Sequence, residues 1–209
     1  DVYKRQVNIP VGILSMYLHR KEQTLPALND LTPAQPPETT PGGQRILDAA
    51  SELFYARGIG ATGLGLVVEQ SGVTKRTLYQ RFGSKEGLIC AYLTARAHRW
   101  QTLVLQRVQV AIDSGEDPVS AVFDLTREWI ADNPRGCGFV NAWAELGGNS
   151  GAEIQTAIRQ EKQWMRTLFF TTTGDEQVGE LIHELYEGAL ICSTILGDQN
   201  ALQLSLIHI

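Results

Sequence analysis

The chain has 209 residues, 43% of them hydrophobic, which is enough to bury a core in one domain or two small ones without disulfides or metals. Its three cysteines (Cys90, Cys137 and Cys192) show no paired spacing, and no secretory leader pattern opens the sequence, so we expect a cytoplasmic protein. The net charge of −5 is unevenly distributed, because residues 42–99 have a balance of +4 and the residues from 100 onward have −9.

Residues 26–43 carry five prolines and two glycines, a composition typical of an extended linker. The apolar run VNIPVGILSMYL at 7–18 is shorter than the roughly 20 residues of a membrane-spanning helix, so we expect no membrane association. It resembles a signature of drug:proton antiporters of the major facilitator type, and the ends DVYKRQ (1–6) and LSLIHI (204–209) resemble adaptor-derived sequence. Residues 1–43 are therefore expected to be a disordered or non-native extension with a Pro-rich linker, and the C-terminus to be truncated.

Beyond the linker, apolar residues recur at helical spacing and predict an all-α fold. The helix boundaries are indicated by Ile46 to Phe54 with a stop at Gly58, by Leu64 to Val68 with a stop at Ser71-Gly72, by the N-cap Thr74, and by the N-cap Ser84 of a helix from Lys85 to about Val110. The acidic half predicts helices over Asp117 to Asn133, Phe139 to Leu146, Ala152 to Phe170 and Glu176 to about Leu196. No alternating strand pattern longer than four residues is present.

The helix after Thr74 has a polar face that suits DNA. Leu78 and Phe82 lie at i and i+4 and point to the core, which turns the other side chains outward. A short helix, a glycine turn and a second short helix form a helix-turn-helix, whose second helix enters the major groove. Long cations and an amide there reach base edges, and nearby hydroxyls and amines reach phosphates. The predicted contacts are Thr62, Thr74, Lys75, Arg76, Thr77, Tyr79, Gln80 and Lys85. A merely solvated charged face is the competing interpretation.

The segments RILDAASELFYARG, Thr62 and GVTKRTLYQRFGSKEGLI, within residues 45–89, resemble the DNA-binding domain of TetR-family transcriptional regulators. The resemblance implies that Lys75, Arg76 and Gln80 read bases, while Thr62, Thr77, Tyr79 and Lys85 contact the DNA backbone. Gly63 and Gly65 depart from the family pattern, and a glycine inside a helix costs up to about 1 kcal/mol, so the second helix is expected to be less rigid than usual.

The acidic half resembles the sensor domain of one TetR subgroup, through RGCGFVNAWAELG (135–147) and LIHELYEGALICSTILGD. The resemblance implies a pocket for a small-molecule effector and a dimer face. The predicted pocket residues are Phe123, Trp129, Phe139, Asn141, Trp143, Trp164, His183 and Tyr186, with Glu145 as a further polar anchor. Plain core packing is the competing interpretation for each aromatic residue.

Catalytic and metal-binding patterns are weak in this sequence. Cys137 between two glycines is compatible with a redox or electrophile sensor, but a buried inert thiol is the favoured interpretation. Glu180, His183 and Glu187 share a helical face, but no further His or Cys joins them, which favours a solvated acidic face. No phosphate loop, nucleophile elbow or paired cysteine motif occurs. We therefore expect neither enzyme activity nor a cofactor.

The sequence as a whole predicts a ligand-responsive repressor that binds a palindromic DNA operator as a homodimer. Residues 44–99 are expected to form the DNA-binding domain, and residues 100–209 the ligand-binding and dimerisation domain, with Tyr186, Leu190 and Ile191 as the dimer stripe. The alternative is a helical small-molecule-binding or interaction module whose DNA binding is lost through truncation.

Overall fold

The computed structural model describes residues 27–198 and 200–203, and within them it contains helices and turns but no strand. The elements are η1 (Leu28–Asp30), α2 (Pro41–Arg57), α3 (Leu64–Ser71), α4 (Lys75–Phe82), α5 (Lys85–Ser114), α6 (Pro118–Asp132), α7 (Gly138–Leu146), η2 (Gly147–Asn149), α8 (Ala152–Thr173) and α9 (Glu176–Ile195). The predicted all-α fold is confirmed. The expectations for residues 1–26, including the run at 7–18, and for residues 204–209 lie outside the described residues.

The helix ends follow local signals in the sequence. The Ser84 hydroxyl accepts a hydrogen bond from the Gly87 N–H and caps α5 as predicted. The Asp117 carboxylate accepts one from the Ser120 N–H and caps α6. Two helices run longer than predicted. α5 continues to Ser114, and α8 continues through three threonines to Thr173 and ends at Gly174, whose φ of 68° and ψ of 9° lie in the left-handed region.

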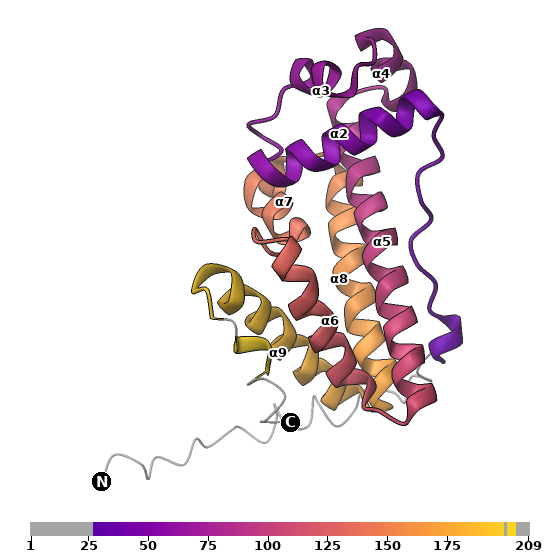
Figure 1. The fold of residues 1–209 in the computed structure, drawn as a ribbon, viewed down its shortest axis with the longest axis vertical. Coiled ribbons are helices and arrows are strands. Elements are labelled where there is room, and N and C mark those ends of the chain that lie inside the picture. Colours follow the sequence, from indigo (N-terminus) through magenta and orange to yellow (C-terminus); the bar gives the residue numbers. More distant parts are fainter. Residues whose placement is uncertain (1–26, 199, 204–209) are drawn as a thin grey trace, which may run out of the picture.

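Two hydrophobic cores share the helices α5 and α8. The first core joins α2, α3, α4 and the N-terminal part of α5 with Phe139 of α7 and Ile154 of α8. The second joins the rest of α5 and α8 with α6 and α9. Figure 1 shows α5 and α8 side by side along the molecule, with α3 and α4 at the end farthest from α6 and α9. The small helical unit, formed by α2, α3 and α4, is therefore fixed to the larger bundle through α5 and α8, which contribute to both cores.

The segment before α2, predicted to be an extended Pro-rich linker, packs against the bundle. Thr40 caps α2 by accepting a hydrogen bond from the Gly43 N–H, and Pro41 occupies the first turn, where its missing N–H has no partner to lose. Upstream, Trp164 Nε1 donates to the Thr32 carbonyl at 2.9 Å, and Ala34 N donates to Gln101 Oε1 at 2.6 Å. This stretch, which we call the strap (residues 31–40), runs along α5 up to α2 (Figure 1).

The second helix of the small unit starts at a glycine. Gly63 is the N-cap of α3, where it makes no side-chain hydrogen bond, and Gly65 lies inside the helix with open space around it.

None of the helices in the described part of the chain combines the length and apolar character needed to cross a bilayer.

Candidate functional site

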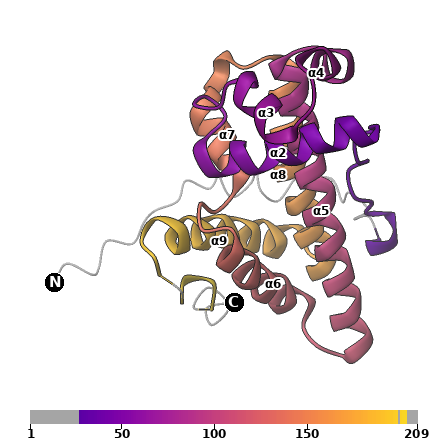
Figure 2. The same cartoon turned by 45° about the horizontal axis from the view of Figure 1, so that its top comes forward.

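The turn between α3 and α4 sets the direction of a short exposed helix (Figure 2). α3 ends at Gly72, whose φ of 62° and ψ of 23° lie in the left-handed region that glycine adopts without strain. The Thr74 hydroxyl then accepts a hydrogen bond from the Thr77 N–H at 3.2 Å and starts α4. Leu78 is fully buried and attaches α4 to the first core. This is the geometry of a helix-turn-helix.

The outer face of α4 presents long polar side chains to solvent. Lys75, Arg76, Tyr79 and Gln80 are exposed, and none of their side chains has a hydrogen bond or ion pair with a described residue. Arg81 adds an exposed cation at the end of the same helix. Unpaired cations and an amide on one protruding helix are the groups that contact phosphates and base edges in a major groove.

Thr62 does not belong to this face, contrary to the prediction. Its side chain is fully buried, and its hydroxyl donates to the Gly58 carbonyl at 2.7 Å, closing the loop between α2 and α3. A hydroxyl used in this way is not available to a phosphate. Two arginines of the basic block also face elsewhere, since Arg96 is only 8% exposed and Arg99 lies over the Trp129 ring.

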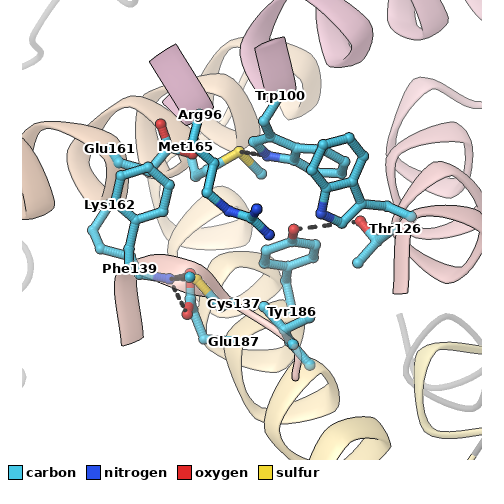
Figure 3. A pocket seen from close by; sticks show the side chains of 14 residues that line it. Arg96, Trp100, Thr126, Cys137, Phe139, Glu161, Lys162, Met165, Tyr186 and Glu187 are labelled. Carbon is cyan, nitrogen blue, oxygen red and sulfur yellow. Dashed lines mark hydrogen bonds and ion pairs between the residues drawn. The ribbon is translucent and has the colours of Figure 1, made fainter. Parts of the chain in front are cut away.

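A cavity of about 40 Å³ lies between α5, α6, α7, α8 and α9 (Figure 3). Its walls are largely aromatic, and four ionisable side chains from α5, α8 and α9 line it as well. The aromatic residues are Trp100, Trp129, Phe139 and Tyr186, and the ionisable ones are Arg96, Glu161, Lys162 and Glu187. Such a mixture of apolar surface and a few placed polar groups is usual for small-molecule sites.

The charged groups of the cavity differ in how they are compensated. Lys162 Nζ lies 2.6 Å and 2.8 Å from the two carboxylate oxygens of Glu187 and 3.5 Å from Cys137 Sγ. Burial alone lowers the pKa of Lys162, but the nearby Cys137 and Glu187 outweigh it and raise that pKa above its ordinary value. Glu161 accepts a hydrogen bond of 2.5 Å from Gln101, and burial raises its pKa to about 7.

A wider groove lies outside the cavity. It has a volume of about 720 Å³, and Phe139 and Lys162 line both spaces. Trp143 and Arg159 lie at the groove, with the Arg159 guanidinium 5.7 Å from the centre of the Trp143 ring.

Residues 46–92 match the family model described as bacterial regulatory proteins, tetR family. The structure is similar to that of SCO4454, a TetR-family transcriptional regulator from Streptomyces coelicolor, with a TM-score of 0.67 and 26% identity over 81% of this chain and 86% of that one. Over these residues the chain is similar to TetR-family regulators. The family model covers the same α2, α3, α4 and α5 segments that build the helix-turn-helix.

Two curated relatives described as HTH-type regulators are also similar to this chain. The HTH-type transcriptional repressor ComR of Escherichia coli K12 is 31% identical over 58% of this chain and 59% of its own length, so this chain spans less than two thirds of that relative. The uncharacterized HTH-type transcriptional regulator YxaF of Bacillus subtilis 168 is 28% identical over 77% of this chain and 89% of its own length.

The TetR-like structure brings only part of the predicted pocket together. Trp129, Phe139 and Tyr186 line the cavity, and Trp143 and His183 line the outer groove with Phe139. The remaining predicted residues are used elsewhere. Phe123 is packed in the second core, Asn141 donates to the Arg135 carbonyl, Trp164 donates to the strap, and the Glu145 carboxylate accepts from the Gly60 N–H.

The most informative cavity residue, Arg96, was not predicted from the sequence. It lies on α5, and its Nη2 donates to Asn133 Oδ1 at 3.1 Å. Its guanidinium lies 4.5 Å from the centre of the Tyr55 ring of α2 and 5.5 Å from that of Trp129. Arg96 packs closely against Gly138, where a Cβ atom would lie 2.6 Å from Arg96 Nε.

Glu180, His183 and Glu187, which share one face of α9, are divided among ion pairs. Glu180 pairs with Arg166, and Glu187 pairs with Lys162. His183 Nε2 lies 3.7 Å from Glu187, and burial lowers the pKa of the imidazole. Within residues 27–198 and 200–203, no group of three or more His, Cys, Asp or Glu side chains is arranged to hold a metal ion.

Proposed function

We propose that this protein is a ligand-responsive transcriptional regulator of the cytoplasm that binds a palindromic DNA operator as a homodimer and represses until an effector occupies the cavity. The observation that carries the proposal is the outer face of α4, where Lys75, Arg76 and Gln80 are exposed without partners in the described chain. In the proposal these three side chains contact bases, and Thr74, Thr77, Tyr79 and Lys85 contact phosphates.

The domain boundaries of the proposal are 44–99 for DNA binding and 100–209 for effector binding and dimerisation. The boundary falls inside α5, which contributes to both cores. We also infer that the chain belongs to the TetR subgroup whose sensor half carries the segment at 135–147. ComR is a repressor by its name, and the repressor role is proposed here by analogy with it.

The proposed dimer face differs from the predicted stripe. Tyr186 and Leu190 are 4% and 5% exposed and are packed in the second core, so they are not available to a second copy. Leu181, Ile191 and Ile195 of α9 are 54%, 38% and 73% exposed and share one helical face with Gly188. An apolar face with a glycine allows close approach of another helix.

Selection of bound duplexes from a random pool tests the proposal. We expect enrichment of an inverted repeat whose half-sites lie about one helical turn, roughly 34 Å, apart. Binding of the selected duplex should also fall steeply as salt is raised, because phosphate contacts release counterions. A pool that stays random after several rounds, with effector binding intact, contradicts the proposal and supports a helical small-molecule-binding module instead.

A further inference from the structure

Arg96 places a buried positive charge in the cavity with no carboxylate paired to it. The residue is 8% exposed, and Figure 3 shows its guanidinium reaching into the space between the aromatic walls. Its contacts among the described residues are one hydrogen bond to Asn133 and the rings of Tyr55 and Trp129. No ion pair joins it to a described Asp or Glu.

Such a charge is unfavourable unless something compensates it. An arginine does not lose its proton in proteins, so burial cannot neutralise it. Removing an ion from water costs several kcal/mol when no counter-ion is supplied. The other cation of the cavity, Lys162, has its counter-ion in Glu187 at 2.6 Å. The cavity therefore contains one compensated cation and one that lacks an anion.

Glu161 does not fill this role, although it lines the same cavity. Its carboxyl group is held by Gln101, and it forms no ion pair with Arg96. Burial raises its pKa to about 7, so near neutral pH a substantial fraction of this group is uncharged.

We propose that the cavity binds a small organic carboxylate, whose carboxylate group pairs with the Arg96 guanidinium and whose apolar part lies between Trp100, Trp129, Phe139 and Tyr186. The inference rests on the proposed function, because it names the chemical class of the effector. The planar fork of a guanidinium matches a carboxylate through two parallel hydrogen bonds.

Size and lining distinguish this ligand from other anions. A phosphate group needs several unpaired donors, whereas Arg96 is the one cation of the described cavity lining that has no acidic partner. A volume of about 40 Å³ suits a carboxylate with few carbon atoms, and a benzoate-sized ligand requires Phe139 to move. Phe139 also borders the outer groove, which gives a route of entry.

Arg96 also connects the cavity to the helix-turn-helix unit. Its guanidinium lies over Tyr55 of α2, whose hydroxyl donates to the Gly136 carbonyl at 3.2 Å. A carboxylate that draws the guanidinium toward the cavity weakens its contact with Tyr55 and so alters how α2 packs against the sensor half. Differential binding to two such arrangements is what allostery requires.

The test uses the full chain and titrates acetate, propanoate and benzoate against their neutral amides, at constant ionic strength. Tryptophan fluorescence reports binding, since Trp100 and Trp129 line the cavity. We expect the best carboxylate to bind at least about ten-fold more tightly than its amide, as hydrogen bonds to charged groups contribute about 1.5–3 kcal/mol. Equal binding of acid and amide, or no binding of any of the three acids, overturns the proposal.

Two arginine variants locate the site. Arg96→Met should weaken carboxylate binding at least about ten-fold. Arg99→Met is the matched control, because Arg99 contacts the same Trp129 but does not line the cavity, and it should bind as the wild type does. If Arg96→Met does not fold by circular dichroism, Arg96→Lys keeps the charge without the planar fork and should show weakened binding. An Arg96 variant that folds and binds carboxylate with unchanged affinity contradicts the proposal.

Operator binding, measured on the same samples by fluorescence anisotropy, separates the two proposals. Duplex binding without carboxylate binding leaves the regulator proposal intact and contradicts the carboxylate site. Carboxylate binding without duplex binding supports the carboxylate site and contradicts the regulator proposal. When both are present, we expect the carboxylate to weaken duplex binding in the wild type and not in the Arg96 variant.

Discussion

Glu161 is a carboxyl group whose surroundings make stability depend on pH. It is 4% exposed, its hydrogen-bond donor is Gln101, and Arg96, Lys162 and Glu187 are the charged groups around it. Burial raises its pKa from 4.5 to about 7 in the folded protein. Because the folded state holds the proton more tightly than the unfolded state, this stabilisation is complete below pH 4.5 and is lost as the pH rises through about 7.

The variant Glu161→Gln should remove this dependence. Relative to the wild type, its free energy of unfolding should fall less between about pH 5 and pH 8, by up to about 3 kcal/mol, since each pKa unit corresponds to about 1.4 kcal/mol. Urea denaturation at the two pH values measures it, with the exposed Glu116→Gln as control. If the free energy of unfolding depended on pH identically in Glu161→Gln and the wild type, the raised pKa of Glu161 would be contradicted.

Arg76 is the exposed arginine near the start of α4 that we expect to read a base. Arg76→Gln should weaken binding to the selected operator by about 1–3 kcal/mol per half-site, because a bidentate contact to guanine is lost. Arg127→Gln is the matched control, since Arg127 is an exposed arginine of α6 paired with Asp124. Equal losses in both variants at one salt concentration would indicate a general charge effect instead of base contact.

The side chains of α4 that face solvent could be predicted from the sequence because Leu78 and Phe82 fix which side faces the core. Those in the cavity could be predicted less well. A buried arginine and an exposed one on α5 look alike in sequence, and side chains from five helices meet only after packing. The prediction that Thr62 contacts DNA is wrong for a related reason. A threonine in a loop can either contact a ligand or close the loop, and here its hydroxyl closes the loop.

At the scale of elements, the start of α7 depends on a residue without a side chain. A Cβ at Gly138 would lie 2.6 Å from Arg96 Nε and 3.1 Å from Tyr92 Oη, so Gly138→Ala forces α7 or Arg96 to move. We expect a loss of about 1–3 kcal/mol in unfolding free energy, as for other overpacked sites. In α3, a Cβ atom added at Gly65 would have no neighbouring heavy atom within 4 Å. Gly65→Ala should therefore raise the free energy of unfolding, by up to about 1 kcal/mol.

Thermal denaturation of these two glycine variants checks the prediction, because they make the same chemical change with opposite expected signs. A stabilised Gly138→Ala variant would mean that the close approach of α7 to Arg96 is absent in solution.

The positions of the helices could be predicted from apolar spacing and caps, whereas the packing of the strap could not. Prolines predicted an extended linker, and in the structure Gln101 accepts a hydrogen bond from this segment and Trp164 donates one to it, so two residues distant in sequence hold it against the bundle.

At the scale of the whole molecule, the apolar face of α9 predicts the oligomeric state. Ile191→Glu introduces a charge on the face that also carries Leu181 and Ile195, and it should shift a dimer to a monomer in size-exclusion chromatography at micromolar concentration. Val110→Glu changes an apolar residue on α5 that is more exposed, at 59%, and should leave the elution volume unchanged. A wild-type protein that elutes as a monomer would contradict the proposed operator geometry.

α5 gives the two ends of the molecule a common rigid axis. It runs without a break for 30 residues, and Arg96 lies eleven residues from its first residue, Lys85, which adjoins α4. At about 1.5 Å per residue this arm is about 17 Å long, so a tilt of about 5° at the cavity displaces its far end by about 1.5 Å. A ligand of only a few atoms could thereby change the spacing between the two α4 helices of a dimer without unfolding any part of the chain.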